Sequence, residues 1–295
     1  MRRLYLLLSF IFCGFCMGGC DFETSHPASS QVAAVSISET ELIPGPTPTW
    51  DNFSTERHVT LPSGLRIDEY ALQDSPELEP LTFVPLRGSQ QEILSQHEDE
   101  RSLTYLNNSF FADGHYSMSV DFGGQELVAR EVTTSNENKP AQLTIEVMRG
   151  DNVINSIPAG DFSPLMPLQG LWAFDGHWIV EVAIVSKTYD ERHNENVFQS
   201  LGLIIKDGED LNQHFAYHET FGFQLLNGKP FHFFNQDGEV GFLYNAQETH
   251  LGYRSVPHYG CCSAAELNPR PAKNMVSFFA QKNGDWYYVE IGVFE

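Results

Sequence analysis

A series of short glycine-containing turns constrains the fold of this chain more than any other feature. Each turn lies between two apolar runs, and its glycine follows Asp, Asn or another Gly. Two-residue hairpin turns need positive φ at their central residues, which Asn, Asp and Gly accept more readily than other residues. So many of these turns predict a chain built from antiparallel β-hairpins. The dipeptides are Asp113-Gly114, Gly123-Gly124, Asp175-Gly176, Asp207-Gly208, Asn227-Gly228, Asp237-Gly238 and Asn283-Gly284.

The residues between the turns support the same prediction. Apolar and polar side chains alternate at a period of two, and β-branched and aromatic residues are frequent. Both properties are typical of strands that bury one face. The fold class is therefore predicted to be all-β, mainly antiparallel. The clearest strand segments are 117–132, 142–148, 177–185, 200–206 and 285–294.

Three of the hairpins, at 172–185, 223–238 and 278–294, are similar to one another. Their glycines are Gly176, Gly228 and Gly284, which lie 52 and 56 residues apart. A four-stranded propeller blade has about this length, so propeller-like repeats of about 50 residues are one interpretation. A β-sandwich or an irregular meander explains the same hairpins without a repeat.

Residues 90–106 depart from the strand pattern and are predicted to form one short, polar helix. Residues 211–223 are expected to be extended. In an extended chain, His214 and His218 share a strand face but lie about 13 Å apart, which is too far to hold one metal ion. They are therefore interpreted as ordinary polar positions.

Residues 57–295 are long enough for a single domain with one sizeable core, since all-β domains commonly reach this length. A division into two domains near residues 136–140 is the less favoured alternative.

The first twenty residues are of a different kind. Arg2 and Arg3 precede the apolar run 4–15, and small residues lead from there to Cys20. This order is typical of a secretory signal peptide, and the apolar run is shorter than the roughly 20 residues of a membrane-spanning helix.

MGGC at 17–20 resembles the lipobox of bacterial lipoproteins. The resemblance implies that residues 1–19 form a lipoprotein signal peptide that is removed and that Cys20 becomes the lipidated N-terminus. It also implies an extracytoplasmic protein that is anchored to the cell membrane. An ordinary secretory signal, cut near Gly19, is the alternative.

Residues 20–56 are rich in Ser, Thr, Pro and Ala and are predicted to form a flexible tether. The chain has a formal net charge of −22, and removal of the two positive charges of Arg2 and Arg3 makes it −24. Such a charge disfavours nucleic acid as a partner. The expected partners are the membrane, through the N-terminal lipid, and a protein or carbohydrate ligand.

Two adjacent cysteines, Cys261 and Cys262, remain once the signal segment is set aside. Outside the cytoplasm thiols tend to oxidise, and a bond between neighbours is strained because their Cα atoms lie only about 3.8 Å apart. A vicinal disulfide is one interpretation. The others are reduced cysteines in a packing role, an intermolecular bond, and a metal site in which His258 joins both thiolates.

No compact catalytic or cofactor motif is present in the sequence. Glu181 and Glu290 interrupt apolar strands and are the candidate catalytic carboxylates, because a buried carboxylate can have a raised pKa. Trp178, Trp286 and Tyr288 are the candidate binding residues, since aromatic rings stack on sugars.

These observations predict a lipid-anchored, extracytoplasmic binding or interaction protein of the cell envelope. No cofactor is expected unless His258, Cys261 and Cys262 bind a metal. A carboxylate-based, carbohydrate-active hydrolase and a thiol or metal site at the two cysteines are the alternative functions.

Overall fold

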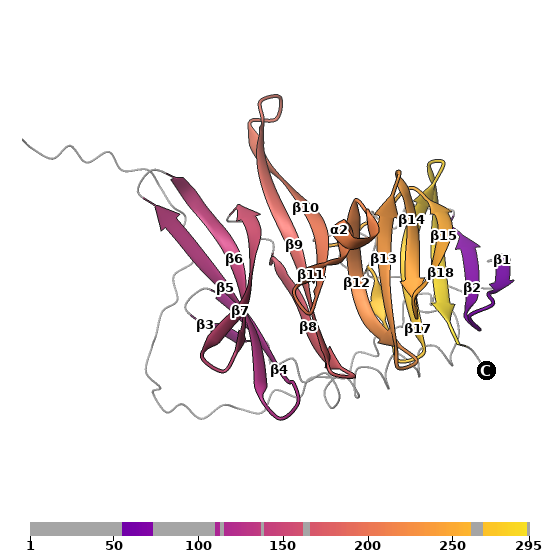
Figure 1. Cartoon of the computed structure of the whole chain (residues 1–295). Helices are drawn as coiled ribbons and strands as arrows, with labels where there is room; N and C mark the ends of the chain where they lie inside the picture. The colour runs from indigo at the N-terminus through magenta and orange to yellow at the C-terminus, as the bar shows by residue number, and fades with distance from the viewer. Residues whose placement is uncertain are drawn as a thin grey trace, which may run out of the picture. The chain divides into compact units, whose positions relative to one another are not determined.

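The structure is a computed structural model, and it describes residues 55–72, 110–112, 115–136, 139–161, 166–260 and 268–293. Most of these residues lie in antiparallel β-strands, which confirms the predicted all-β class (Figure 1). The predicted helix at 90–106 lies outside the described residues. So do the lipobox, residues 20–54 of the predicted tether, and Cys261 and Cys262.

The largest sheet has nine strands and is curled into a half-barrel. Its order is β11-β10-β9-β7-β6-β5-β4-β3, and β8 also pairs with β9. The strands are β3 (Phe110–Ala112), β4 (His115–Asp121), β5 (Glu126–Asn136), β6 (Lys139–Arg149), β7 (Asn152–Asp161), β8 (Leu168–Phe174), β9 (His177–Asp190), β10 (Glu195–Lys206) and β11 (Glu209–Asp210).

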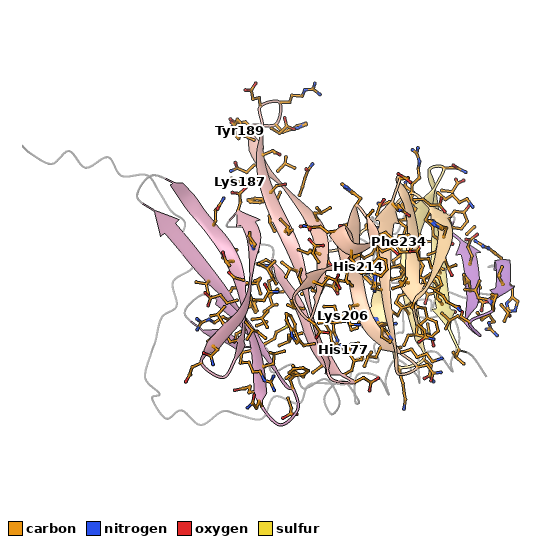
Figure 2. The ribbon with its side chains drawn as sticks, in the orientation of Figure 1. His177, Lys187, Tyr189, Lys206, His214 and Phe234 are labelled. Carbon is orange, nitrogen blue, oxygen red and sulfur yellow. The ribbon has the colours of Figure 1, made fainter. Side chains whose placement is uncertain are left out.

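Asn136, Lys139 and Pro140, from the stretch weighed as a domain boundary, belong to strands of this sheet. Asn136 at the end of β5 pairs with Lys139 at the start of β6. Farther along the chain, β9 and β10 form a long hairpin, and Lys187 and Tyr189 lie toward its tip (Figure 2).

A four-stranded meander follows, in the order β12-β13-β14-β15. Its strands are β12 (Glu219–Leu226), β13 (Lys229–Gln236), β14 (Glu239–Tyr244) and β15 (Gln247–Tyr253). It is preceded by the short helix α2 (Leu211–Phe215), which Asp210 caps by accepting the Gln213 N–H. The expectation that 211–223 is extended is therefore wrong for 211–215. An Asp cap satisfies a backbone donor that a helix start leaves free.

The third sheet contains both ends of the described chain, in the order β1-β2-β18-β17-β16. Its strands are β1 (Thr55–Thr60), β2 (Arg66–Ala71), β16 (Arg270–Pro271), β17 (Met275–Lys282) and β18 (Asp285–Gly292). Because β1 starts at Thr55, the strand begins two residues before the domain boundary expected at residue 57. The pairing of β2 with β18 ties the first described strands to the last.

The turn chemistry predicted from the sequence is present. In six dipeptides both residues have positive φ, which is the geometry of the tight hairpin turn expected there. A seventh turn of this kind, Asn245-Ala246, has φ values of 48° and 63° and was not predicted because it has no glycine. The six predicted dipeptides are Gly123-Gly124, Asp175-Gly176, Asp207-Gly208, Asn227-Gly228, Asp237-Gly238 and Asn283-Gly284.

Two large cores hold the sheets together. One lies within the curl of the nine-stranded sheet and includes Leu127, Ile145 and Val180. The other joins the four- and five-stranded sheets through rings such as Phe233 and Phe278, which meet edge to face at 4.9 Å between ring centroids. Burial of this apolar surface is the main favourable contribution to folding.

A smaller cluster of Ile179, Ile204, Leu211 and Phe223 covers the other face of β9 and β10, where these strands meet β12. The middle of β9 is consequently buried on both faces. This contact with β12 positions the site described next.

Candidate functional site

Glu181 lies where β9 meets β12. Along β9, Trp178, Val180 and Val182 belong to the core inside the curled sheet, whereas Ile179 belongs to the cluster on the other face. Side chains alternate along a strand, so Glu181 points to the same face as Ile179, toward β12. The side chain is buried, with only 3% of its residue surface exposed.

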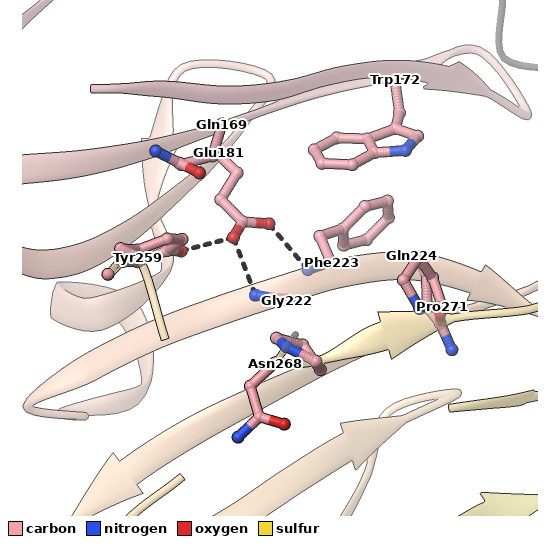
Figure 3. Close-up of a pocket in the computed structure, with 11 residues that line it drawn as sticks. Gln169, Trp172, Glu181, Gly222, Phe223, Gln224, Tyr259, Asn268 and Pro271 are labelled. Atoms are coloured by element: carbon pink, nitrogen blue, oxygen red, sulfur yellow. Dashed lines mark hydrogen bonds between the residues drawn. The ribbon is translucent and has the colours of Figure 1, made fainter. Parts of the chain in front are cut away.

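Both carboxylate oxygens of Glu181 accept hydrogen bonds from the chain itself (Figure 3). The backbone N–H of Gly222 donates to Oε1 at 2.8 Å, and that of Phe223 donates to Oε2 at 2.7 Å. The hydroxyl of Tyr259 also donates to Oε1. We call this set of four residues the Glu181 clamp. It joins β9 to β12 and to the segment after β15.

The two backbone donors are available because β12 has a bulge. Its pairing with β13 shifts register between Phe221 and Gln224, which leaves the N–H groups of Gly222 and Phe223 outside the ladder. Gly222 has φ of +65°, and a Cβ atom there would lie 2.6 Å from Cγ of Pro269. Glycine is therefore required at this position.

Burial raises the pKa of Glu181 because it penalises the ionised form more than the hydrogen bonds and the charge of His258 favour it. Burial also raises the pKa of Tyr259 well above its ordinary value, and the nearby Glu181 carboxylate adds to the effect. Tyr259 is thus a hydrogen-bond donor at neutral pH. Its φ of 55° is rare for a bulky residue and is maintained by its surroundings.

A second buried carboxylate, Glu219, joins the same sheets in the opposite direction, because here the acid is on β12 and the backbone donor is on β10. Glu219 lies on β12 and accepts the Gly202 N–H of β10 at 2.7 Å. Glycine at 202 permits this approach, because a Cβ atom there would lie 2.3 Å from the Thr220 carbonyl oxygen. Next along β12, the Thr220 hydroxyl accepts the Ile204 N–H of β10 at 2.9 Å. Side chains therefore satisfy the backbone of β10 that faces β12.

Burial alone would raise the pKa of Glu219, but the hydrogen bond and charge of His258, with the Gly202 N–H, outweigh it and lower the pKa. Nε2 of His258 lies 3.1 Å from Glu219, and Nδ1 lies 2.6 Å from the Val256 carbonyl oxygen. Each ring nitrogen of His258 therefore faces an oxygen of the chain.

This geometry bears on the predicted metal site. A histidine ligates a metal through a nitrogen lone pair, and both nitrogens of His258 are occupied. The described residues hold no group of three or more His, Cys, Asp and Glu side chains suited to a metal ion. Cys261 and Cys262 lie outside those residues, so their redox state and their part in metal binding remain predictions.

A cavity of about 230 Å³ adjoins the Glu181 clamp, and we call it the Glu181 pocket. Figure 3 shows the Trp172 indole and the Phe223 ring on one side of it and Asn268 on another. Gly260 and Asn268, the described residues on either side of 261–267, both line the cavity. The remaining described lining residues are Gln169, Glu181, Gly222, Gln224, Tyr259, Pro269 and Pro271.

The polar side chains of this pocket differ in what they have left to offer a ligand. Asn268 is occupied, because its amide exchanges hydrogen bonds of 2.7 and 2.8 Å with the backbone of Phe279. Gln224 donates to the Met275 carbonyl oxygen at 3.5 Å, and its Oε1 has no partner among the described residues. Gln224 therefore lines the pocket and has a buried acceptor without a partner among the described residues.

The other sequence-predicted residues lie elsewhere. Glu290 is fully buried in β18, accepts the Tyr288 hydroxyl at 3.0 Å and does not line the Glu181 pocket. Tyr288 is 6% exposed and Trp178 is 7% exposed. Trp286 is partly buried against a small cluster that includes Tyr288. The structure thus does not bring Glu181 and Glu290 together in this pocket, nor the three aromatic residues.

Sequence reasoning missed Trp172, Gln224 and Tyr259. Trp172 and Trp178 flank the same turn, and the five residues between them gave no sign of which ring lines a pocket. Tyr259 lies 78 residues from Glu181 along the chain, so only the fold brings them together. The sequence feature that came nearest to indicating this pocket was the pair of prolines after the cysteines, Pro269 and Pro271, both of which line it.

Among the described residues, no helix has the length and apolar character needed to cross a membrane. Comparison with known protein families, with curated protein sequences and with solved structures finds no match for this chain.

Proposed function

We propose that this chain is a lipid-anchored binding protein of the cell envelope, tethered through Cys20, and that its Glu181 pocket recognises a saccharide. The observation that carries the proposal is the saturation of the Glu181 carboxylate by three donors of the chain itself, beside a cavity with unused aromatic and amide surface. Because these three hydrogen bonds position Glu181, Gly222, Phe223 and Tyr259 relative to one another, they keep one wall of the pocket in a defined arrangement.

The ligand chemistry follows from the wall of the pocket. An indole such as that of Trp172 favours the apolar face of a sugar ring, and the unused Oε1 of Gln224 favours a hydroxyl or amide donor. Among simple sugars, N-acetylglucosamine offers both an apolar ring face and an amide N–H. We therefore choose it as the probe.

A carbohydrate-active hydrolase is the competing proposal. Glycoside hydrolysis ordinarily needs two carboxyl groups about 5 to 10 Å apart on either side of the bond. Among the described residues that line the pocket, Glu181 is the single acid. This distribution of carboxylates supports binding over hydrolysis.

A thiol or metal function at Cys261 and Cys262 is a separate proposal. Gly260 and Asn268, the described residues nearest the cysteines in the sequence, line the Glu181 pocket. Because Glu219 and Val256 occupy both ring nitrogens of His258, a metal at Cys261 and Cys262 would need another ligand in place of His258.

For the fold, we propose that the meanders are propeller-like units. The strands β8 to β11 and β12 to β15 each form an antiparallel series, and β2 completes a third with β16, β17 and β18. Gly176 and Gly228 then occupy the first turn of their units, whereas Gly284 lies in the second turn of the third. The core shared by two facing sheets favours the sandwich alternative.

Isothermal titration calorimetry of the full chain with N-acetylglucosamine tests the binding proposal. Trp172→Ala and Gln224→Leu are expected to weaken binding by about tenfold or more, the size of one lost stacking or hydrogen-bonding contact. Trp286→Ala is the matched control, since Trp286 does not line the pocket. Equal affinity in all three variants would remove the basis for the proposal.

A further inference from the structure

A second cavity, of about 290 Å³, lies on the other side of the β12 bulge. Phe223 lines both cavities, and the remaining described lining residues of the second one come from β8 to β11, α2, β13, β14 and the turn after β14. We call it the Lys206 pocket. Its wall is mostly apolar, with Phe174, Leu211 and Phe215 among the side chains.

Lys206 supplies a positive charge at this pocket, at the end of β10 (Figure 2). Its cross-strand partner is Glu209, but the Glu209 carboxylate bonds Nδ1 of His214 at 2.6 Å. No acidic side chain lies within ion-pair distance of Lys206 in the part of the chain that the structure describes. The ammonium group of Lys206 is therefore not neutralised by a carboxylate of the described residues, although the chain has a net charge of −22.

His232 adds a second unsatisfied group. It lies on β13, opposite the bulge of β12, and is 3% exposed. Burial lowers the pKa of His232 to about 4, so the ring is neutral at pH 7. Its Nε2 has no hydrogen-bonding partner among the described residues. An unpaired buried polar atom is unfavourable, and a ligand that bonds it would remove this cost.

We propose that the Lys206 pocket binds a small carboxylate with an apolar, aromatic-sized body. The body would lie among Phe174, Leu211, Phe215 and Phe223. The carboxylate would pair with the ammonium group of Lys206, and His232 would provide the polar group in the wall. This site is separate from the Glu181 pocket and does not depend on the saccharide proposal.

The experiment compares three probes with the same body and different heads: 3-phenylpropanoate, 3-phenylpropan-1-ol and 3-phenylpropylamine. Each is titrated calorimetrically into the full chain at pH 7. We expect the carboxylate to bind about tenfold more tightly than the alcohol, as for one charge-assisted hydrogen bond, and the amine to bind most weakly. Equal binding of acid and alcohol, or no binding of the acid, would overturn the proposal.

Lys206→Met keeps an aliphatic side chain and removes the charge. It is expected to abolish the preference for acid over alcohol. Lys187→Met is the matched control, because Lys187 lies toward the hairpin tip and outside both pockets. An identical loss in the two variants would show a general charge effect and would contradict a site at Lys206.

Nuclear magnetic resonance of the unsubstituted chain provides a measurement that does not rely on a variant. The ring ¹⁵N signals of His232 are expected to shift on saturation with 3-phenylpropanoate, whereas those of the exposed His193 should not. Unchanged His232 signals at saturation would exclude this pocket as the binding site.

Discussion

The Glu181 clamp predicts a specific cost for Glu181→Gln. The amide keeps one acceptor oxygen, so it can serve either the donors at Oε1 or the Phe223 N–H at Oε2, but not both sets. A buried backbone N–H without a partner costs about 1 to 3 kcal/mol. Loss of a buried charge offsets part of this cost, because burial raises the pKa of Glu181.

We therefore expect the free energy of unfolding to fall by about 2 kcal/mol in Glu181→Gln and by about 3 to 6 kcal/mol in Glu181→Leu, which leaves three donors unpaired. Equilibrium unfolding in urea, followed by tryptophan fluorescence, measures both changes. The midpoint should fall by about 1 M in Glu181→Gln.

Glu239→Gln is the control for this measurement. Glu239 also accepts a backbone N–H, that of Gly252 at 2.9 Å, but its side chain is 44% exposed. Water can replace the lost acceptor there, so the expected change is within about 0.5 kcal/mol. If Glu181→Gln is no more destabilising than Glu239→Gln, the argument that the clamp joins β9 to β12 is refuted.

Three further predictions concern stability and the cysteines. Burial lowers the pKa of His232 to about 4 from 6.5, so as the pH falls the unfolded chain binds a proton at His232 before the folded chain does. The contribution of His232 to the free energy of unfolding should therefore drop by about 3 kcal/mol between pH 6.5 and 4. Urea titrations of His232→Leu over this pH range should lack this drop. Gly222→Ala should cost about 2 kcal/mol or more and Gly228→Ala, with open space around it, about 1 kcal/mol by thermal unfolding; equal costs would contradict the required bulge. Mass spectrometry without reductant should show a loss of two hydrogens that maps to Cys261 and Cys262, whereas free thiols would refute the vicinal disulfide.

Local signals predicted much of the fold. Asp or Asn before Gly identified hairpin turns because these residues accept positive φ, and the period-two pattern identified strands that bury one face. The turn at Asn245-Ala246 was missed because Ala rarely adopts positive φ. The α2 helix was missed because five residues are too few to show a helical period.

The site was predictable only in part. Glu181 was identified because a carboxylate interrupts an apolar strand. Its partners Gly222 and Tyr259 lie 41 and 78 residues away, and a bulge that frees two backbone donors leaves no pattern in the sequence. The choice between Trp172 and Trp178 depends on which face of a strand is covered, which is a property of the packed sheets.

The most direct test of the central claim is one nuclear magnetic resonance sample that contains the full chain and N,N′-diacetylchitobiose, a disaccharide of N-acetylglucosamine. Saturation transfer from protein to sugar measures binding, and the anomeric proton signals report hydrolysis in the same tube. The account predicts saturation transfer with unchanged anomeric signals over days. Growth of new reducing-end signals would support a hydrolase, and the absence of saturation transfer would contradict the binding site itself.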